Sequence, residues 1–360
     1  MAGGKVNLQR TRVSKKYRKV LRAGYVDLCE WALFNDRPHP AALSEDARAM
    51  SELLIDFIQD AFERNKPLSH GRRAILAVQY EFRHLVKSLR GPWDSISHWQ
   101  ERQPVQLRVP CTRLIAYAVF CSALLRGFVT DTRNAHLWIP FGVMVRTGWT
   151  ALMRPGEIVN LRGKHIVLPS ALHAALTDTA ILMIDRPKNR RHLGRQQVCR
   201  VDDMTSTAWL RWLLEDMYPE LKIFPASGAT FRALFEEMCE ELGVTEIGLT
   251  AGSLRPGRAT HLFLEGMETS RLRVMGRWKR LESLDHYIQV ASAALTHIQL
   301  SSPVLCNLEA IVNRAQVFAQ PPSRPWTDFL SRDSQLRSHL QWKPLRSRLR
   351  RQCGKPWLID

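Results

Sequence analysis

Apolar residues recur at three- and four-residue steps through most of the chain, and this periodicity constrains the fold more than any other feature. From Leu43 to about Phe128 the repeat is typical of helices that bury one face. Two short apolar runs, 179–185 and 196–201, are instead typical of strands. The sequence therefore predicts a mainly α protein with a small β-sheet (α+β). The repeat is clearest at Met50, Leu53, Leu54, Phe57, Ile58 and Phe62.

Length and proline placement predict how the chain is divided. With 360 residues, 45% of them hydrophobic, the chain can form two domains. A polar stretch bounded by Pro104 and Pro110 has the composition of an interdomain linker. We expect a basic N-terminal arm over 1–42, a helical bundle over 43–105, a larger domain over 106–300 and a basic, loosely ordered tail over 301–360. The basic ends fit solvated tails, phosphate-binding arms or a nuclear-import signal, and the sequence leaves these open.

The charge balance favours a polyanionic partner. Lysine and arginine number 52 against 34 acidic residues, a net charge of +18. Nucleic acid is the leading partner, and an anionic membrane surface is the alternative. We expect no membrane association, because no uninterrupted apolar stretch reaches the length of a span, and hence an intracellular protein. The seven cysteines form no CxxC pair, and the histidines have no metal-ligand spacing, so we expect neither a metal nor another cofactor.

The second half is expected to alternate helices with the two strands. Pro155 suits the first turn of a helix. The strands form a hairpin whose basic loop contains Lys188, and Gly243 and Gly266 are candidate helix C-caps. Helices are predicted over 114–125, 137–150, 205–218, 230–242, 254–265, 270–277 and 281–295.

Arg255 lies 32 residues before Tyr287, with Gly276 and Trp278 between them. Cutting a phosphodiester by side-chain attack adds negative charge to the nonbridging oxygens, which fixed arginines can stabilise. A tyrosine nucleophile can form a phosphotyrosyl link that conserves bond energy for rejoining. Taken singly, Trp278 and Tyr287 could be packing residues, Arg154 with Glu157 a surface ion pair, and Lys188 a solvated cation.

Four segments in order give these residues a common pattern. The second half of the chain, about residues 110–297, resembles the catalytic domain of the tyrosine recombinases, the phage-integrase-like family. The first motif of that family is an arginine followed three residues later by a glutamate, and the second is a lysine in a hairpin loop. The third is a histidine three residues before an arginine, in front of an Ala-Thr pair. The fourth is a glycine followed by a His or Trp that lies nine residues before a tyrosine. The matching residues are Arg154, Glu157 and Leu161, then Lys188, then Leu254, Arg255, Ala259 and Thr260, and last Gly276, Trp278 and Tyr287.

The resemblance implies a role for each matched residue. Tyr287 would attack the scissile phosphate and form a 3′-phosphotyrosyl link without a metal. Arg154 and Arg255 would hold the nonbridging oxygens, and Trp278 would donate one hydrogen bond to the phosphate. Lys188 would donate a proton to the departing 5′-oxygen. The resemblance also implies a core-DNA-binding role for the helical bundle, double-stranded DNA as partner and a homo-tetramer assembled on DNA, in the nucleus if the source is eukaryotic.

The third motif departs from the family at one position. Gly252 stands where the histidine belongs, so no side chain is present there to take the tyrosine proton. A neighbour such as Thr250, Ser253 or His286 could compensate. The alternative function is a catalytically impaired, recombinase-fold DNA-binding protein. A third hypothesis, a basic nucleic-acid scaffold unrelated to this family, requires Arg154, Lys188, Arg255 and Tyr287 to lie apart.

Overall fold

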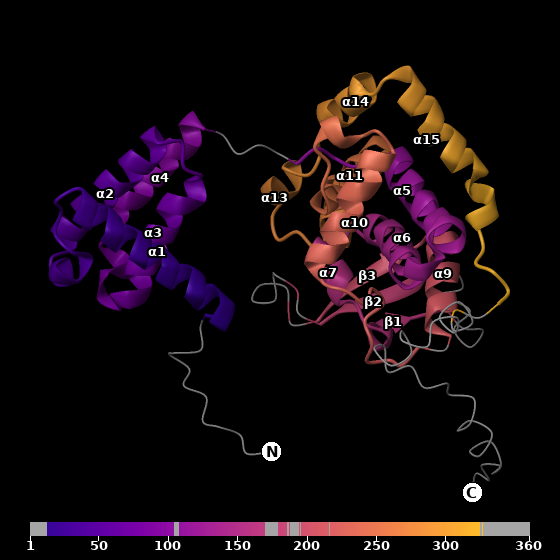
Figure 1. The fold of residues 1–360 in the computed structure, drawn as a ribbon, viewed down its shortest axis with the longest axis horizontal. Coiled ribbons are helices and arrows are strands. Elements are labelled where there is room, and N and C mark those ends of the chain that lie inside the picture. Colours follow the sequence, from indigo (N-terminus) through magenta and orange to yellow (C-terminus); the bar gives the residue numbers. More distant parts are fainter. Residues whose placement is uncertain are drawn as a thin grey trace, which may run out of the picture. The chain divides into compact units, whose positions relative to one another are not determined.

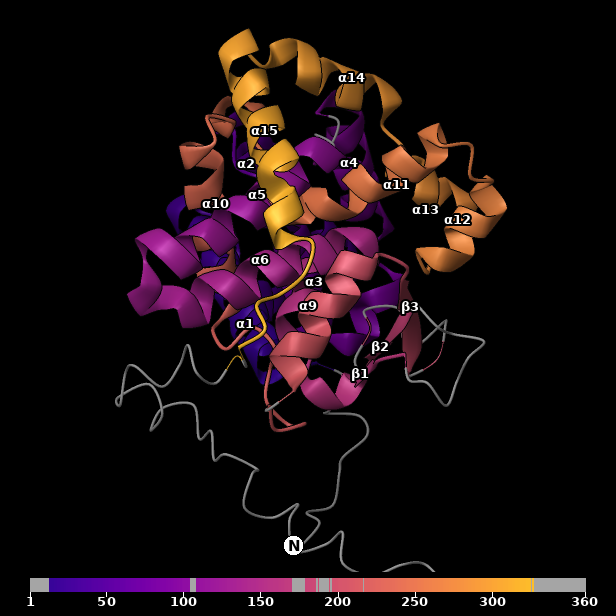
Figure 2. The same ribbon diagram turned by 90° about the vertical axis from the view of Figure 1, so that its right-hand side faces the viewer.

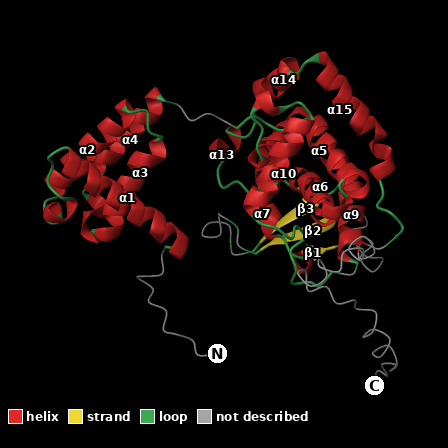
Figure 3. Ribbon diagram, viewed as in Figure 1, coloured by secondary structure: helices red, strands yellow, loops and turns green. Residues whose placement is uncertain are grey.

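The chain forms two compact units, Met1–Gln106 and Leu107–Asp360 (Figure 1). The structure is a computed structural model, and it describes residues 13–103, 108–169, 179–185, 187, 194, 196–215, 217–324 and 326. Helices dominate the described residues, and a small sheet lies at one edge of the second unit (Figure 3). This confirms the predicted mainly α fold with a small β-sheet.

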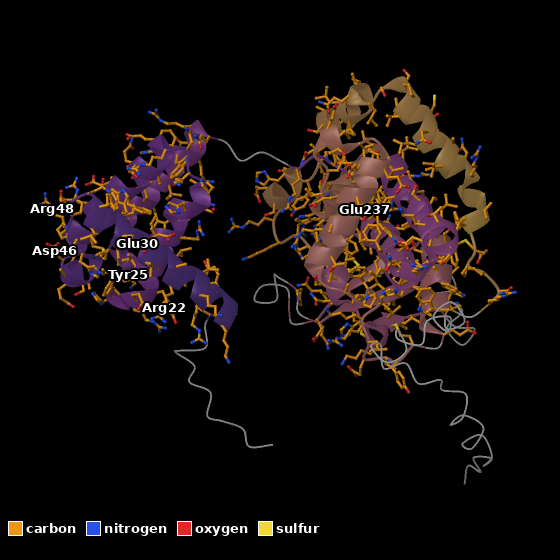
Figure 4. The ribbon with its side chains drawn as sticks, in the orientation of Figure 1. Arg22, Tyr25, Glu30, Asp46, Arg48 and Glu237 are labelled. Carbon is orange, nitrogen blue, oxygen red and sulfur yellow. The ribbon has the colours of Figure 1, made fainter. Side chains whose placement is uncertain are left out.

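The described residues of the first unit form a bundle of four α-helices around one apolar core. Asp46, which Figure 4 labels near Arg48, begins the second helix. Its carboxylate accepts hydrogen bonds from the backbone N–H groups of Arg48 and Ala49 at 3.0 and 2.9 Å. Leu54 and Ile75 are completely buried in the core between the helices. The helices are α1 (Lys15–Phe34), α2 (Ala47–Glu63), α3 (Leu68–Glu81) and α4 (Arg90–Arg102), with 3₁₀ turns η1 (Pro40–Leu43) and η2 (Arg83–Lys87).

Helix α1 corrects the expectation of a basic arm over 1–42. Its Leu28 and Ala32 are fully buried and belong to the core of the bundle, and it packs along α3. Basic residues dominate the composition of its start, whereas the burial depends on an apolar stripe at helical spacing, Leu21, Leu28 and Ala32. The expected arm is thus helical over Lys15–Phe34, and residues 1–12 lie outside the described residues.

Two buried helices, α5 (Arg113–Leu125) and α6 (Ala135–Thr150), form the centre of the second unit. Gly148 lets the following helix approach closely, because a Cβ there would lie 2.8 Å from Cγ1 of Ile158. One helical segment, Arg113–Thr130, is long and apolar enough by length and composition to cross a membrane, although Arg126 interrupts its apolar run. Most of its α5 residues are packed in the core cluster.

Within the part of the chain that the structure describes, the sheet has three antiparallel strands in the order β1-β2-β3. Strands β2 (Ala180–Ile184) and β3 (Gln197–Val201) confirm the two predicted strands, and Leu182 pairs with Cys199. The sequence missed β1 (Ile166–Val167), which is too short to show an alternating pattern. Leu182 and Cys199 face the core, so one face of the sheet packs against the helices.

The remaining helices surround this centre, and α15 runs along α5 in both views (Figures 1 and 2). Gly243 and Gly266 end two of them in the left-handed conformation, at φ +70° and +83°, as predicted for C-caps. The helices are α7 (Pro155–Asn160), α9 (Met204–Leu214), α10 (Gly228–Glu241), α11 (Leu254–Leu264), α12 (Thr269–Met275), α13 (Leu281–Asp285), α14 (Val290–Gln299) and α15 (Ser302–Arg314).

The start of the predicted loose tail is packed. Leu308 of α15 is fully buried, and Trp326 lies 5.3 Å from the ring centroid of Trp212. Backbone carbonyls of the tail accept hydrogen bonds from buried indoles, Trp209 to Phe318 and Trp212 to Arg324. These contacts pack the start of the tail against the second unit, which its composition did not predict. Residues 327–360, with their cluster of arginines, lie outside the described residues.

Candidate active site

Arg154 stands at the start of α7, where the predicted first motif lies. Pro155 occupies the first helical position, as its fixed φ favours, and Arg154 is the N-cap residue. The Glu157 carboxylate accepts hydrogen bonds from the Arg154 backbone N–H at 3.0 Å and from its guanidinium at 2.8 Å. The helix start therefore fixes both the backbone and the side chain of Arg154.

Glu157 also binds a second arginine, one that the sequence did not single out. Nη2 of Arg277 lies 2.8 Å from Oε2 of Glu157, and both side chains are nearly buried. Burial alone would raise the pKa of Glu157, but the charges of Arg277 and Arg154 and the backbone N–H lower it. Arg277 lies between Gly276 and Trp278 of the fourth motif, and that adjacency was the one signal that could have found it.

Arg255 is 2% exposed, and its guanidinium is held by backbone carbonyls. Nη1 donates to the Leu152 carbonyl at 2.7 Å and Nη2 to the Gly276 carbonyl. Arg277 also donates to the Leu152 carbonyl, at 3.3 Å, which joins the two arginines. Burial and the charges of Arg154 and Arg277 lower the pKa of Arg255. The cluster thus has three guanidinium groups, of which those of Arg154 and Arg277 bind the Glu157 carboxylate, and this leaves net positive charge in a buried place.

Trp278 and Tyr287 lie against this arginine cluster. The Arg255 guanidinium carbon lies 4.3 Å from the Trp278 ring centroid and 5.4 Å from that of Tyr287, and the two rings are 5.1 Å apart. Among the described residues, the buried Nε of Arg255 and Nε1 of Trp278 meet no hydrogen-bond acceptor. Buried donors without an acceptor are costly, so both fit a site that an anion completes.

Tyr287 lies in a turn, which corrects the predicted continuous helix over 281–295. Helix α13 ends at Asp285 and α14 begins at Val290. Between them, Oγ1 of Thr260 donates to the Tyr287 carbonyl and accepts from the Gln289 backbone N–H, both at 3.0 Å. These bonds replace helical ones and fix the Tyr287 backbone to α11. The Ala-Thr pair of the third motif therefore positions the tyrosine.

A cleft of about 830 Å³ opens beside Arg154 and Glu157. It extends to Ile184 at the end of β2 and to Asp185 directly after it, and basic residues Arg162 and Lys164 also line it. Lys188, predicted to act from the loop after β2, lies outside the described residues. Within the described ranges, no three His, Cys, Asp or Glu side chains gather closely enough to hold a metal ion.

Gly252 is buried in the 3₁₀ turn η8 (Ala251–Ser253), directly before α11. Two neighbours suggested as substitutes for the missing histidine are engaged in this turn: the Thr250 hydroxyl accepts from the Gly252 N–H at 3.2 Å, and the Ser253 hydroxyl accepts from the Thr250 N–H at 3.1 Å. His286 is exposed in the turn before Tyr287. The structure thus brings Arg154, Arg255, Trp278 and Tyr287 together, contrary to what the unrelated-scaffold hypothesis requires.

Solved structures that resemble the chain include the following three. The Tn1549 transposon integrase in complex with transposon right end DNA is 13% identical and covers 81% of this chain and 96% of its own, with a TM-score of 0.53. XerA recombinase is 15% identical and covers 84% of this chain and 94% of its own, with a TM-score of 0.36. XerH site-specific recombinase bound to difH substrate is 12% identical and covers 74% of this chain and 70% of its own, with a TM-score of 0.42.

No protein-family model matches the chain, and no curated protein matches it. The likeness to the transposon integrase spans both units and nearly the whole of that protein, at an identity that speaks for the fold alone. It agrees with the order of the four sequence segments and with the gathering of their described arginines and tyrosine. The chain has a tyrosine-recombinase-like fold.

Proposed function

We propose that the chain is a site-specific DNA recombinase or integrase that cuts and rejoins DNA through a 3′-phosphotyrosyl intermediate. One observation carries the proposal: the guanidinium groups of Arg154, Arg255 and Arg277 gather beside Tyr287, and two of them, Arg154 and Arg277, bind the same carboxylate, that of Glu157. Such a cluster has the charge to bind a phosphodiester, and it has a nucleophile next to it.

The chemistry follows from these positions. The Tyr287 oxygen attacks phosphorus, a new P–O bond to the tyrosine forms, and the bond to the 5′-oxygen breaks. The phenol loses its proton to solvent or a nearby base, and the leaving oxygen takes one, in this proposal from Lys188. Arg154, Arg255 and the Trp278 indole stabilise the charge that develops on the nonbridging oxygens. Fixed arginines supply this charge themselves, so the proposed reaction uses no metal.

Double-stranded DNA is the proposed partner. The net charge of +18 favours a polyanion, and the transposon integrase of similar fold was solved in complex with transposon right end DNA. Because that protein is the integrase of a transposon, we propose a mobile-element role for this chain. From the resemblance of the four sequence segments we also propose a homo-tetramer on DNA and an intracellular, DNA-associated location, in the nucleus if the source is eukaryotic.

Gly252 supports a second function, a DNA-binding protein that has lost turnover. A missing general acid–base group costs roughly 10²–10⁴ in rate. The phosphate-binding arginines would still bind DNA, because their positions depend on Glu157, Leu152 and Gly276 rather than on residue 252.

The two functions differ in whether a covalent adduct forms. Since the target is unknown, Tyr287→Phe protein is first used to select bound duplexes from a randomised DNA library. Wild-type protein is then incubated with nicked suicide versions of the selected duplexes and separated by denaturing electrophoresis. A DNA-linked band present in wild type and absent in Tyr287→Phe supports the recombinase. Tight binding without any adduct supports the noncatalytic protein.

A further inference from the structure

The space beside Gly252 is filled by an arginine from a distant part of the sequence. A Cβ built on Gly252 would lie 2.8 Å from Cζ of Arg108 and 3.1 Å from its Cδ, with Nη1 closer still. The Arg108 guanidinium therefore lies against Gly252, where a side chain at position 252 would begin. Glycine is the residue that leaves room for it there.

The backbone just after Arg108 is fixed to the turn and helix that carry Gly252 and Arg255, η8 and α11. The Cys111 N–H donates to the Ser253 carbonyl at 2.9 Å, and the Cys111 carbonyl accepts from the Trp149 indole at 3.0 Å. A Cβ on Gly257 would lie 2.6 Å from the Cys111 carbonyl carbon, so the segment also packs tightly on α11. These contacts hold Cys111, three residues after Arg108, against both η8 and α11.

Position 252 lies close to the arginine cluster. It precedes Arg255 by three residues, which on a helical turn places both residues on neighbouring faces about 5 Å apart along the axis. Arg255 is buried, whereas Arg108 is exposed. The guanidinium of the exposed Arg108 can therefore bind a phosphate from the solvent side, while the buried Arg255 binds the same phosphate from the protein side.

We propose that Arg108 is a further phosphate-binding residue of this site and that it supplies the positive charge missing at Gly252. The inference rests on the proposed function and names one more residue in it. Because an arginine stays protonated at working pH, Arg108 can donate hydrogen bonds to a nonbridging oxygen but cannot take the tyrosine proton. Arg108 thus replaces the absent histidine in stabilising charge on the phosphate, and solvent or another group accepts the tyrosine proton.

A double-mutant cycle tests the pairing. Arg108→Ala lowers the rate of adduct formation by about 10²–10³, the usual cost of removing one preorganised donor. Gly252→Ala lowers it as well, because the new Cβ displaces the guanidinium. The protein still folds, since the displaced atoms are the end of a flexible side chain. In the Arg108→Ala background, Gly252→Ala has no further effect.

The control is Arg133→Ala. Arg133 is exposed and lies before the first residue of α6, whereas Arg154 lies after its last residue. Because a 16-residue helix is about 24 Å long, Arg133 lies at the opposite end of α6 from Arg154 of the site. This variant is expected to keep the wild-type rate. Arg108→Lys, which retains charge but loses the planar fork, is expected to give an intermediate rate. A wild-type rate in Arg108→Ala, or fully additive losses in the cycle, would overturn the proposal.

A binding measurement separates this proposal from the proposed function. The affinity for a nonspecific duplex is measured between 50 and 200 mM salt, and each phosphate contact contributes about 0.9 to the slope of log K against log salt concentration. Arg108→Ala is expected to reduce the slope by about that amount, and Arg133→Ala to leave it unchanged. If wild type forms no adduct but the slope falls, strand cutting is refuted while Arg108 remains a phosphate-binding residue. Equal slopes for wild type and Arg108→Ala refute the role of Arg108.

Discussion

Glu157→Gln removes the carboxylate that binds two of the three site arginines, Arg154 and Arg277. Glu157 lies 2.8 Å from a nitrogen of Arg154 and 2.8 Å from a nitrogen of Arg277. Glutamine has nearly the same shape and keeps one acceptor oxygen, so the substitution changes charge more than packing. We expect the variant to be less stable and to depend more strongly on a bound anion.

The magnitude follows from burial. The Glu157 side chain is 7% exposed, and breaking a buried ion pair costs about 3–5 kcal/mol because the partner charge remains buried. We expect about 3 kcal/mol, the lower end, since glutamine can still accept one hydrogen bond. For a unit of this size, each kcal/mol lowers the melting temperature by about 2–4 °C, giving a decrease of about 6–12 °C.

Differential scanning calorimetry of the full chain measures this change at pH 7. Asp202→Asn is the control, because Asp202 is exposed and pairs with Arg200 at 2.9 Å. An exposed pair is worth about 0.2–1 kcal/mol, so the control should melt close to wild type. Inorganic phosphate should raise the melting temperature of Glu157→Gln more than that of wild type. Equal melting temperatures for Glu157→Gln and wild type would refute the shared-carboxylate argument.

The same variant predicts a pH dependence. The pKa of Glu157 is lowered in the fold from its ordinary value of 4.5, so the stability it provides is present above that value and is lost as the pH falls. The difference in melting temperature between wild type and Glu157→Gln should therefore shrink below about pH 4.5. A difference that grows in acid would contradict the lowered pKa.

Two further substitutions test particular contacts. Gly257→Ala should destabilise the second unit by about 1–3 kcal/mol in thermal unfolding, because its Cβ would collide with the Cys111 backbone. The control is Gly156→Ala, whose Cβ would meet nothing within 4 Å. Equal stability of the two variants would argue against the contact. Thr260→Val should slow adduct formation while preserving DNA affinity, because Thr260 fixes the Tyr287 backbone. Thr296→Val, which removes another buried hydroxyl away from this turn, should leave the rate unchanged, and equal rates in both variants would contradict the positioning role.

Part of the fold could be predicted because periodic burial shows directly in the sequence. Leu54 and Ile75 follow helical spacing, and the runs around Leu182 and Cys199 are strands as expected. Helix α1 was missed because basic residues at its start masked Leu28 and Ala32. Strand β1 has two residues and no pattern to detect.

The site could be predicted where it depends on residue order and not where it depends on long-range contacts. The spacing of Arg255, Trp278 and Tyr287 anticipated their gathering. The break at Tyr287 arises from hydrogen bonds to Thr260, 27 residues earlier, which local propensity cannot show. Arg108 lies 144 residues before Gly252, so its contact is visible only in three dimensions.

The most direct measurement is to identify the residue that becomes attached to DNA. After reaction with a suicide substrate, the adduct is digested with nuclease and trypsin, and the nucleotide-bearing peptide is sequenced by mass spectrometry. Cleavage after Arg280 and Arg314 releases a peptide in which Tyr287 is the one tyrosine. We predict a nucleotide joined to Tyr287 through its 3′-phosphate. A nucleotide on any other residue, or a 5′-phosphate linkage, would contradict the proposed mechanism.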